Sequence, residues 1–389
     1  MTPVLARSAP EALAGERFDV AVVGAGLAGS AAARLLAQNG HRVALLEKRR
    51  LPQHKVCGCC LNARALAHLN ALGLQNLPAT LGGRPLARVH LAAEGRTASL
   101  PLPGGMAVSR YRLDAALANA AAAAGVTYVD GVAATISDSD GEGHFLALQA
   151  KGRTVTLHAR LVLAADGLHG SLLRQAHDSA PRVAANARIG AGAYYCAGQG
   201  DYAPGVIYMA TGAGGYVGLV RTEGDGLDVA AAFDPGFVRA AGGLERAARH
   251  VLDTAGLPPL AGEPLVPWRG TPTLTRQPAR RWAYRMLAVG DAAGYIEPFT
   301  GEGMAWALGS AHAVVPAARR AHLHWHPGIG ADWERLHARA VQRRQWICRA
   351  VAAGLRRPRF TSLALNVLAL QPAVARPAVA WLNARGEAR

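Results

Sequence analysis

The sequence predicts an α/β fold, and three observations along its 389 residues carry that prediction. Residues 20–47 read as an apolar strand, a Gly-x-Gly-x-x-Gly turn, an alanine-rich helix and a second apolar strand. Residues 183–275 contain short apolar runs separated by Gly and Pro, which are typical of a mostly antiparallel sheet. Residues 321–389 have a helical pattern. We therefore expect a Rossmann-like βαβ domain, an inserted, mostly antiparallel β-sheet domain and a helical C-terminus.

The glycine turn between the first strand and the first helix has the residues that a dinucleotide site needs. Gly24 permits the tight turn, Gly26 leaves no Cβ between the backbone and a pyrophosphate, and Gly29 lets the helix pack closely on the strand. Leu27 and Ala28 open the helix, whose unpaired N–H groups and macrodipole favour an anion. A glycine-rich turn in an ordinary α/β protein is the alternative, because Gly supplies 45 of the 389 residues.

Glu47 ends the second strand, eighteen residues after Gly29. Its carboxylate is placed to accept hydrogen bonds from an adenosine ribose, and it would repel a phosphate at the ribose 2′ position. The position therefore favours FAD or NAD over NADP. Lys48, the next residue, is also a cofactor-binding candidate.

The remaining elements follow from periodicity and from glycine and proline signals. Residues 1–17 read as a loose tail. Helices are expected at 63–72, 110–125 and 304–320, and strands at 81–108, 126–129, 145–163 and 286–289. The chain then divides into a discontinuous cofactor domain (17–80, 105–180 and 280–320), a substrate-binding β domain (81–104 and 181–279) and a basic helical region (321–389).

The middle sheet is expected to expose one face to solvent and to turn the other over a pocket. Successive side chains of a strand point to opposite faces, so the strand register decides which of them reach the pocket. Aromatic candidates to line it, each with ordinary packing as the alternative, are Tyr194, Tyr195, Tyr208, Tyr216 and Trp268.

The charge distribution is strongly basic, with a formal net charge of +16, and nearly all of the basic residues are Arg. From residue 316 onward, thirteen Arg face three acids, so +10 of that charge lies in the last fifth of the chain. Such a surface attracts an acidic carrier protein or an anionic membrane surface, and a solvated helical face is the alternative. Nucleic acid is not expected, because no nucleic-acid motif accompanies the charge.

An apolar run at residues 361–370, next to Arg356, Arg357 and Arg359, suits a helix that lies at a membrane interface. Buried packing is the alternative for this run. No apolar run is long enough to span a bilayer, and the first residues do not read as a signal peptide. We expect a cytoplasmic protein, peripheral at the membrane if the 361–370 run binds lipid.

Three of the five cysteines lie together, at Cys57, Cys59 and Cys60. Their number and spacing do not predict a secreted disulfide framework. The cluster also lacks the second pair that a structural zinc site needs, so no metal is expected. Cys57 and Cys60 have the spacing of a redox pair, which leaves disulfide chemistry as an alternative.

Three separated signals occur in order along the chain. They are the Gly24 turn with Glu47, Ala165-Asp166-Gly167 followed by Ser171 and Arg174, and Gly290-Asp291 followed by Pro298 and Gly301-x-Gly303. Together they resemble the FAD-dependent oxidoreductase superfamily of aromatic-ring hydroxylases, geranylgeranyl reductases and flavin halogenases, over residues 18–320. The resemblance implies FAD as the cofactor, bound on a βαβ domain of the glutathione-reductase type.

The resemblance also implies a set of FAD-binding residues: Gly24, Gly26, Leu27, Ala28, Gly29, Glu47, Lys48, Cys57, Gly58, Arg110, Asp166, Gly290, Asp291, Gly301 and Gly303. Within this set, Asp291 would bond a ribityl hydroxyl, and Arg110 would approach the cofactor from the start of the middle helix. Pro298, Gly301 and Gly303 would surround the flavin, where a helix dipole stabilises the negative charge of the reduced ring. No side-chain acid or base is assigned.

Residues 55–58 and 290–303 look more like the geranylgeranyl reductase branch, which also includes monooxygenases and halogenases, than like phenol hydroxylases. Halogenation is not expected, because no two Trp are separated by one residue as in the halogenase Trp-x-Trp-x-Ile-Pro element. Prenyl reduction is disfavoured, because the reductases usually have an aromatic-rich Tyr-x-Trp-x-Phe-Pro run where this chain has Tyr-Val-Gly-Leu-Val at 216–220.

We therefore expect an NAD(P)H-dependent FAD monooxygenase that hydroxylates a small lipophilic aromatic or polyketide-like secondary metabolite. A geranylgeranyl reductase-like reductase or desaturase of an isoprenoid or acyl chain is the first alternative, and a non-catalytic membrane-surface flavoprotein is the second. A second Gly-x-Gly-x-x-Gly βαβ unit is absent from the sequence, so NAD(P)H would bind transiently or a partner would deliver electrons.

Overall fold

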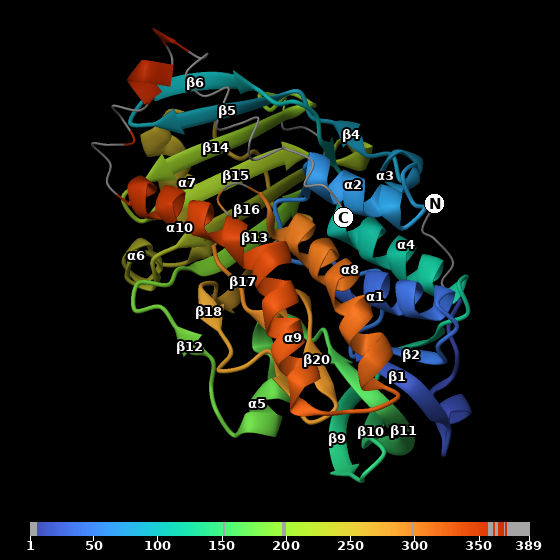
Figure 1. The fold of residues 1–389 in the computed structure, drawn as a ribbon. Coiled ribbons are helices and arrows are strands. Elements are labelled where there is room, and N and C mark those ends of the chain that lie inside the picture. The colour runs from blue at the N-terminus through green and yellow to red at the C-terminus, as the bar shows by residue number, and fades with distance from the viewer. Residues whose placement is uncertain are drawn as a thin grey trace.

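The computed structural model describes residues 6–150, 152–196, 200–297, 299, 301–356, 361, 365–368, 370 and 371. Two sheets dominate this part of the chain, one mainly parallel and one mainly antiparallel, and helices pack on both (Figure 1). The predicted α/β fold class is confirmed.

The mainly parallel sheet has the strand order β19-β20-β11-β1-β2-β8. The bounds are β1 Arg17–Val23, β2 Val43–Glu47, β8 Thr127–Asp130, β11 Arg153–Ala164, β19 Trp282–Ala283 and β20 Met286–Ala288. β20, β11, β1, β2 and β8 run parallel to one another, and the edge strand β19 is antiparallel. β2 is buried along its whole length because both faces of a parallel sheet are covered.

Helices cover one face of this sheet (Figure 1). They are α1 Leu27–Gln38, α2 Ala63–Ala71, α4 Arg110–Ala122, α8 Gly303–Ala321 and α9 Pro327–His337. α1 begins directly after Gly26, and its buried alanines Ala31 and Ala32 let it lie close to α4 and α8. These helices and the sheet share one apolar core, which includes the fully buried Leu163.

The opposite face of the sheet packs against a short N-terminal helix and another helix, together with a hairpin that is itself hydrogen-bonded to the first part of β11. These are η1 Pro10–Leu13, β9 Ala133–Ser139 with β10 His144–Ala150, and α5 Ser171–His177. Leu13 is fully buried beside Phe18, and the N–H of Ser8 donates to the carbonyl oxygen of Tyr128 at 2.8 Å. The expected loose tail is therefore wrong for residues 6–16, because Leu13 anchors them in the core.

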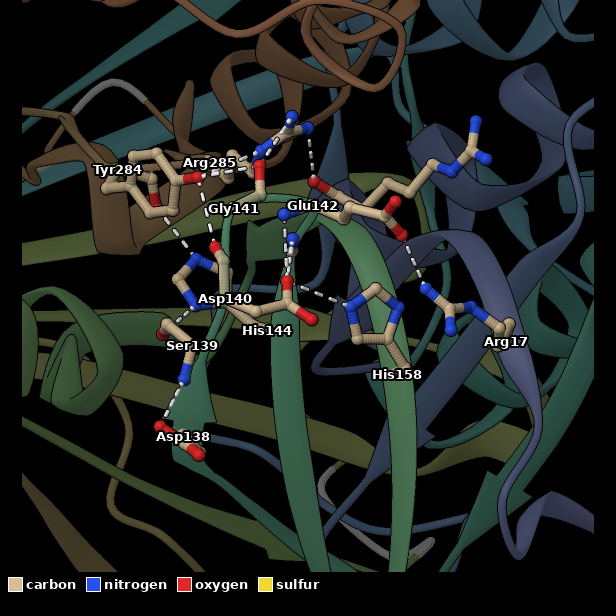
Figure 2. Close-up of polar contacts among 12 residues, drawn as sticks. Arg17, Asp138, Ser139, Asp140, Gly141, Glu142, His144, His158, Tyr284 and Arg285 are labelled. Carbon is tan, nitrogen blue, oxygen red and sulfur yellow. Dashed lines mark hydrogen bonds and ion pairs between the residues drawn. The ribbon is translucent and has the colours of Figure 1, made fainter.

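A polar cluster ties the β9–β10 hairpin to the turn between β19 and β20 (Figure 2). Nε2 of His158 lies 3.4 Å from the Asp140 carboxylate, and Nε2 of His144 lies 2.8 Å from the carbonyl oxygen of Tyr284. The Tyr284 hydroxyl donates to the carbonyl oxygen of Asp140 at 3.1 Å. In the register of the parallel strands β1 and β11, His158 lies opposite Arg17, the first residue of β1. This cluster therefore lies at the amino ends of the parallel strands.

The mainly antiparallel sheet has the strand order β17-β13-β16-β15-β14-β5-β6. Its strands are β5 Arg88–Ala93, β6 Arg96–Pro101, β13 Ile189–Tyr195, β14 Val206–Gly212, β15 Gly215–Arg221, β16 Leu227–Phe233 and β17 Val266–Thr273. β14 and β5 are parallel, and the other neighbours are antiparallel. Smaller elements are β3 Cys60–Leu61, β4 Arg84–Pro85, β7 Met106–Ala107, β12 Arg182–Val183, β18 Arg276–Gln277 and α3 Leu77–Thr80.

Two helices interrupt the stretch that the sequence pattern assigned to strands, α6 Pro235–Ala241 and α7 Leu244–Ala255. α7 buries Ala247, Val251, Leu252 and Ala255 in the core that it shares with the sheet. These residues recur at the helical spacing that buries one side of a helix. The expectation that one face of this sheet is solvated is therefore wrong, because α7 packs on it.

The chain continues after α9 through a π-helical turn, Ala338–Gln342, into α10, Arg343–Leu355. Part of the 361–370 run lies outside the described residues. Leu365 of that run is buried against Ala93 and Ala98 of β5 and β6, whereas Leu370 is 84% exposed. Within the described part of the chain, helices long and apolar enough to cross a membrane are absent.

Candidate functional site

Four residues of the three predicted motifs come together at the carboxyl edge of the parallel sheet. Gly24 follows β1, Asp166 lies two residues after β11, Asp291 lies three residues after β20, and Glu47 ends β2. Val23, the last residue of β1, is level with the last residue of β11 and the next-to-last residue of β2. Open α/β sheets bind their ligands in the crevice at this edge.

Two glycines of the turn are required by close backbone approaches. A Cβ on Gly24 would lie 2.2 Å from the carbonyl oxygen of Ala165, and one on Gly29 would lie 1.9 Å from the carbonyl oxygen of Gly24. Gly24 also has a φ of +111°, which favours glycine. No larger residue fits at either position without a backbone shift, because β11 and α1 pack directly on the turn.

Gly26 differs, because a Cβ there would meet its neighbours only at ordinary van der Waals distances. Its φ is −80°, and a Cβ there would lie 3.7 Å from Nη2 of Arg110 and 3.8 Å from Nζ of Lys55. The backbone before α1 therefore faces two cations. Leu27 and Ala28, the first residues of α1, are buried, which fixes the first helical turn on the sheet.

Asp114 holds both cations in place. Nε and Nη2 of Arg110 donate to its two carboxylate oxygens at 2.6 and 2.8 Å, and Nζ of Lys55 donates at 2.8 Å. Asp114 is fully buried, and burial alone would raise its pKa, but Arg110 and Lys55 outweigh burial and lower it. Two cations on one carboxylate leave positive charge beside Gly26, and this fits the pyrophosphate of a dinucleotide.

Glu47 braces the glycine turn. Its Oε2 accepts a hydrogen bond from the N–H of Ala25 at 2.9 Å, and its Oε1 accepts one from the N–H of Arg49 at 3.1 Å. A carboxylate has about four lone-pair positions, so these bonds leave acceptor capacity for ribose hydroxyls. Lys48 is exposed, and it lies near enough to His169 to help burial lower the pKa of that imidazole.

Asp166 caps α5 with one oxygen and leaves the other without a donor. Its Oδ2 accepts hydrogen bonds from Oγ of Ser171 at 2.6 Å and from the N–H of Leu172 at 3.1 Å. Its Oδ1 is buried and has no hydrogen-bond partner among the described residues. A buried acceptor of this kind is a place where a ligand hydroxyl can donate.

Asp291 belongs to the same site as Arg110. Burial raises the pKa of Asp291 to about 6, Arg110 opposes that rise, and Cys57 adds to it. Gly290 has a φ of +61° and approaches α1 so closely that a Cβ there would lie 2.8 Å from Cβ of Ala28. The Gly290-Asp291 turn, Arg110 and the start of α1 therefore enclose one site.

A small pocket with a cavity volume of about 20 Å³ adjoins Asp291 on the side of α5. Its lining includes Arg174 and His177 of α5 and Arg276 of β18. Arg276 is held by the carbonyl oxygen of Leu168, to which its Nη1 donates at 2.7 Å. The pocket therefore presents cationic side chains next to the edge where the motifs meet.

The cysteine loop reaches this site through Cys57. The Cys57 and Cys59 thiols are hydrogen-bonded, and the pKa of Cys57 falls to about 6, chiefly through Cys59 and also through Arg110. Cys60 instead donates to the carbonyl oxygen of Gly58 at 2.9 Å, and Gly58 is exposed. Asp228 of β16 is hydrogen-bonded to Cys59, and burial raises the Asp228 pKa well above its usual range.

The segment before α8 is only partly described, since Pro298 lies outside the described residues. Gly301 is exposed with a φ of +71°, and Gly303 begins α8. Glu302 between them is fully buried and lies 3.9 Å from Arg344 and 3.7 Å from Sγ of Cys348. These two contacts of the Glu302 side chain run to α10.

An apolar cluster, which we call the apolar wall, covers the sheet face opposite α7. Its buried members are Met209, Tyr216, Ala232 and Leu274, and the half-buried Tyr295 and Phe299 pack against them. Tyr216 and Phe299 meet edge to face, with ring centroids 5.0 Å apart. The wall therefore joins the second sheet to the segment after Asp291.

The other predicted aromatic residues divide between the two sheet faces. Tyr195 and Trp268 lie on the α7 side, where Nε1 of Trp268 donates to the Tyr195 hydroxyl at 3.1 Å. Tyr208 packs edge to face on Tyr202 in the same core. Tyr194 points the other way and lies tilted against His54, with ring centroids 5.2 Å apart.

Sequence reasoning missed Asp114 and Asp228 as site residues. Asp114 lies four residues after Arg110, which is the spacing of a pair on one helix face. Asp228 is the one charged residue of β16, and it occupies the same face as Ala230 and Ala232. Both signals were present in the sequence, and the strand register was needed to interpret the second.

Comparison with known proteins adds a family match. Residues 17–186 match the FAD binding domain family. Conditioned medium factor receptor 1 of Dictyostelium discoideum is 27% identical over 75% of this chain and 61% of its own length. A menaquinone reductase of Mycolicibacterium smegmatis is 32% identical over 41% of this chain and 39% of its own length. The chain thus matches less than two thirds of either relative.

Solved structures extend the likeness to nearly the whole chain. A geranylgeranyl bacteriochlorophyll reductase-like protein from Thermoplasma acidophilum has a TM-score of 0.78 at 21% identity, over 94% of this chain and 98% of its own. The flavin-dependent brominase Bmp2 has a TM-score of 0.78 at 15% identity, over 94% and 93%. These two likenesses show the fold.

Proposed function

We propose that this chain is a member of the FAD-dependent oxidoreductase superfamily of aromatic-ring hydroxylases, geranylgeranyl reductases and flavin halogenases, and that it acts as an NAD(P)H-dependent monooxygenase of a small lipophilic aromatic or polyketide-like molecule. FAD, when bound, supplies the redox chemistry by accepting hydride and passing electrons to oxygen. The protein binds and orients FAD and the substrate, and it keeps water away from the reacting carbon of the substrate.

The apolar wall is the observation that carries the substrate class. Tyr216, Met209 and Phe299 contribute aromatic and thioether groups to the wall, and the Arg188 guanidinium lies 5.8 Å from the centroid of the Tyr216 ring. Tyr295 of the wall lies near Asp291. Burial and the Asp291 carboxylate together raise the pKa of Tyr295. A lipophilic molecule against the wall would be desolvated beside the proposed flavin site.

In this proposal the cofactor is held from three sides. Arg110 and Lys55 face the pyrophosphate over Gly26, the free oxygen of Asp166 accepts from a hydroxyl, and Asp291 bonds the ribityl chain. The pocket that contains Arg174 and Arg276 offers guanidinium groups for the phosphates of a transient NAD(P)H. The 32% identity to a menaquinone reductase and the 34% identity to a squalene monooxygenase over 94 residues are consistent with a lipophilic substrate.

A second candidate, reduction of a carbon–carbon double bond, is favoured by one specific observation. Such a reduction needs a proton in addition to a hydride. Burial raises the pKa of Asp228 well above its usual range, which favours the protonated carboxyl, and Asp228 interacts with Cys59, which contacts Cys57. This buried chain of acidic groups could supply the proton near the cofactor site.

Product analysis distinguishes the two candidates. FAD-loaded protein is incubated with NADH or NADPH and with menaquinone, squalene or an electron-rich polyketide aromatic, under ¹⁸O₂ and under argon. A product that gains one ¹⁸O atom and forms only under oxygen supports the monooxygenase. A product that gains two hydrogens under argon supports the reductase and overturns the first proposal. NAD(P)H oxidation that no substrate stimulates would instead support the non-catalytic flavoprotein.

A further inference from the structure

The outer side of α10 combines an exposed tryptophan with arginines. Trp346 is 71% exposed, so the large apolar area of its indole ring remains in contact with solvent. Arg343 precedes it by three residues and Arg349 follows it by three, so all three lie on one side of the helix. Arg339, in the π-helical turn before α10, is exposed as well. We call Arg339, Arg343, Trp346 and Arg349 the outer face of α10.

The opposite side of α10 is fixed against the protein. Gln345 and Cys348 are buried, and Cys348 packs with Ile296 and Trp306. At the end of the helix, Arg356 donates to the Asp234 carboxylate at 3.1 Å. The orientation of α10 is therefore set by its inner side, and the exposure of Trp346 follows from that docking.

The arginines of the outer face are not used for internal pairing. Among the described residues, Arg339, Arg343 and Arg349 make neither an ion pair nor a side-chain hydrogen bond. Arg320 and Arg335 in the same basic region both pair with Asp332. The positive charge of the outer face is thus available to an external anion.

We propose that the outer face of α10 binds an anionic lipid bilayer. An indole ring favours the headgroup level of a bilayer, and guanidinium groups bind lipid phosphates while their aliphatic stems lie along apolar surface. A protein interface would desolvate Trp346 and its arginines together at the centre of the contact, whereas the headgroup layer of a bilayer accepts the indole and leaves the guanidinium groups solvated. The observations therefore favour a membrane over an acidic protein.

The membrane contact would give a lipophilic substrate a route to the site, and this role of the contact rests on the proposed function. Ile296, which packs on the inner side of α10, directly follows Tyr295 of the apolar wall. A bilayer bound to the outer face would therefore lie one helix away from the segment that carries the wall. A lipophilic substrate is concentrated in that bilayer, so docking would shorten its path to the site.

Flotation with vesicles tests the contact without any turnover. The full FAD-loaded chain is mixed with pure phosphatidylcholine vesicles or with vesicles that also contain phosphatidylglycerol. We expect it to float with the anionic vesicles and to be released by high salt, which screens exposed charge. Arg343→Gln/Arg349→Gln and Trp346→Ala should each lower the vesicle partition constant about tenfold or more, a loss that equals about 1.4 kcal/mol.

Arg320→Gln/Arg335→Gln is the matched control, because it removes the same charge from arginines that are already paired. It should float like the parent chain, and bound FAD and thermal melting should be unchanged in all variants. An equal loss of vesicle binding in both double variants would show that binding depends only on net charge, and it would overturn the proposal. Arg343-dependent binding to immobilised polyglutamate without flotation would point to an acidic protein and would also overturn it. Absence of monooxygenase activity would leave flotation unaffected, so the two proposals fail separately.

Discussion

Arg110 and Asp114 form a bidentate ion pair one helical turn apart on α4, with the Asp114 carboxylate completely shielded from solvent. The same carboxylate binds Lys55 from the loop after β2, so one buried anion positions both cations that face Gly26. Breaking a buried pair by removing one partner costs far more than the pair contributes, because it leaves an uncompensated charge.

Asp114→Ala should therefore destabilise the FAD-free protein by about 3–5 kcal/mol. Asp332→Ala, which breaks the exposed pairs with Arg320 and Arg335, should cost about 0–1 kcal/mol. Urea denaturation measures both. The lowered pKa of Asp114 means that its contribution is complete above the unfolded pKa of about 3.9 and disappears as pH falls through the folded value. A cost for Asp114→Ala as small as that for Asp332→Ala would contradict the positioning role.

The glycine turn allows folding and cofactor binding to be separated by two matched substitutions. Gly26→Ala places a methyl group at ordinary van der Waals distance from Arg110 and Lys55 at φ −80°, so the FAD-free protein should melt as the parent does. The methyl group would occupy the proposed pyrophosphate position, so we expect FAD affinity to fall at least tenfold, which equals about 1.4 kcal/mol. Flavin fluorescence titration measures this loss.

Gly24→Ala should behave in the opposite way. Its Cβ would lie 2.2 Å from the Ala165 carbonyl oxygen at a φ of +111°, so the substitution should lower stability even without FAD. If Gly26→Ala bound FAD like the parent, the turn would not be the pyrophosphate site.

Cys57 should react with iodoacetamide at a lower pH than an ordinary thiol. Its pKa falls to about 6 through the Cys59 thiol and Arg110, and the thiolate is the reactive form. In FAD-free protein, mass spectrometry of the Cys57 peptide should give an alkylation rate that is half-maximal near pH 6. Cys59→Ala should move this midpoint upward. An unchanged midpoint in that variant would show that the Cys59 thiol does not stabilise the Cys57 thiolate.

Much of the fold could be predicted from sequence because it depends on local patterns. Strand, glycine turn, helix and terminal acid at residues 20–47 are each specified by neighbouring residues, and the structure has them in that order. The α7 helix was missed although Ala247, Val251 and Ala255 recur every four residues. The short apolar runs on either side of α7 are typical of strands, so the whole stretch was predicted as strands. Only the tertiary packing shows that α7 covers the sheet.

Residues of the candidate site could be predicted where they belong to a local sequence motif. They could not be predicted where their position depends on contacts between distant segments. Gly24, Asp166 and Asp291 meet at one sheet edge because parallel strands share their carboxyl ends. Lys55 and Asp114 meet only through the packing of a loop on α4, 59 residues later in the chain. The Asp228 contact with Cys59 likewise depends on the register of β16.

His337 should make the protein sensitive to mild acid. It is 1% exposed, it packs edge-on against Trp333 with ring centroids 5.4 Å apart, and neither ring nitrogen has a hydrogen-bond partner among the described residues. Burial, assisted by Arg281, lowers its pKa to about 3. Below the unfolded pKa of about 6.5 the unfolded chain therefore binds a proton that the folded chain does not, and stability falls with pH until about pH 3.

The expected loss from His337 between pH 8 and pH 5 is about 2 kcal/mol, since each pH unit below 6.5 costs about 1.4 kcal/mol. His337→Phe removes the titrating ring, keeps the aromatic contact with Trp333, and should abolish that part of the loss. Urea denaturation at both pH values measures the difference, with His324→Phe at an exposed position as the control. A pH dependence in His337→Phe equal to that of the parent would mean that the folded protein protonates His337 as readily as the unfolded chain does.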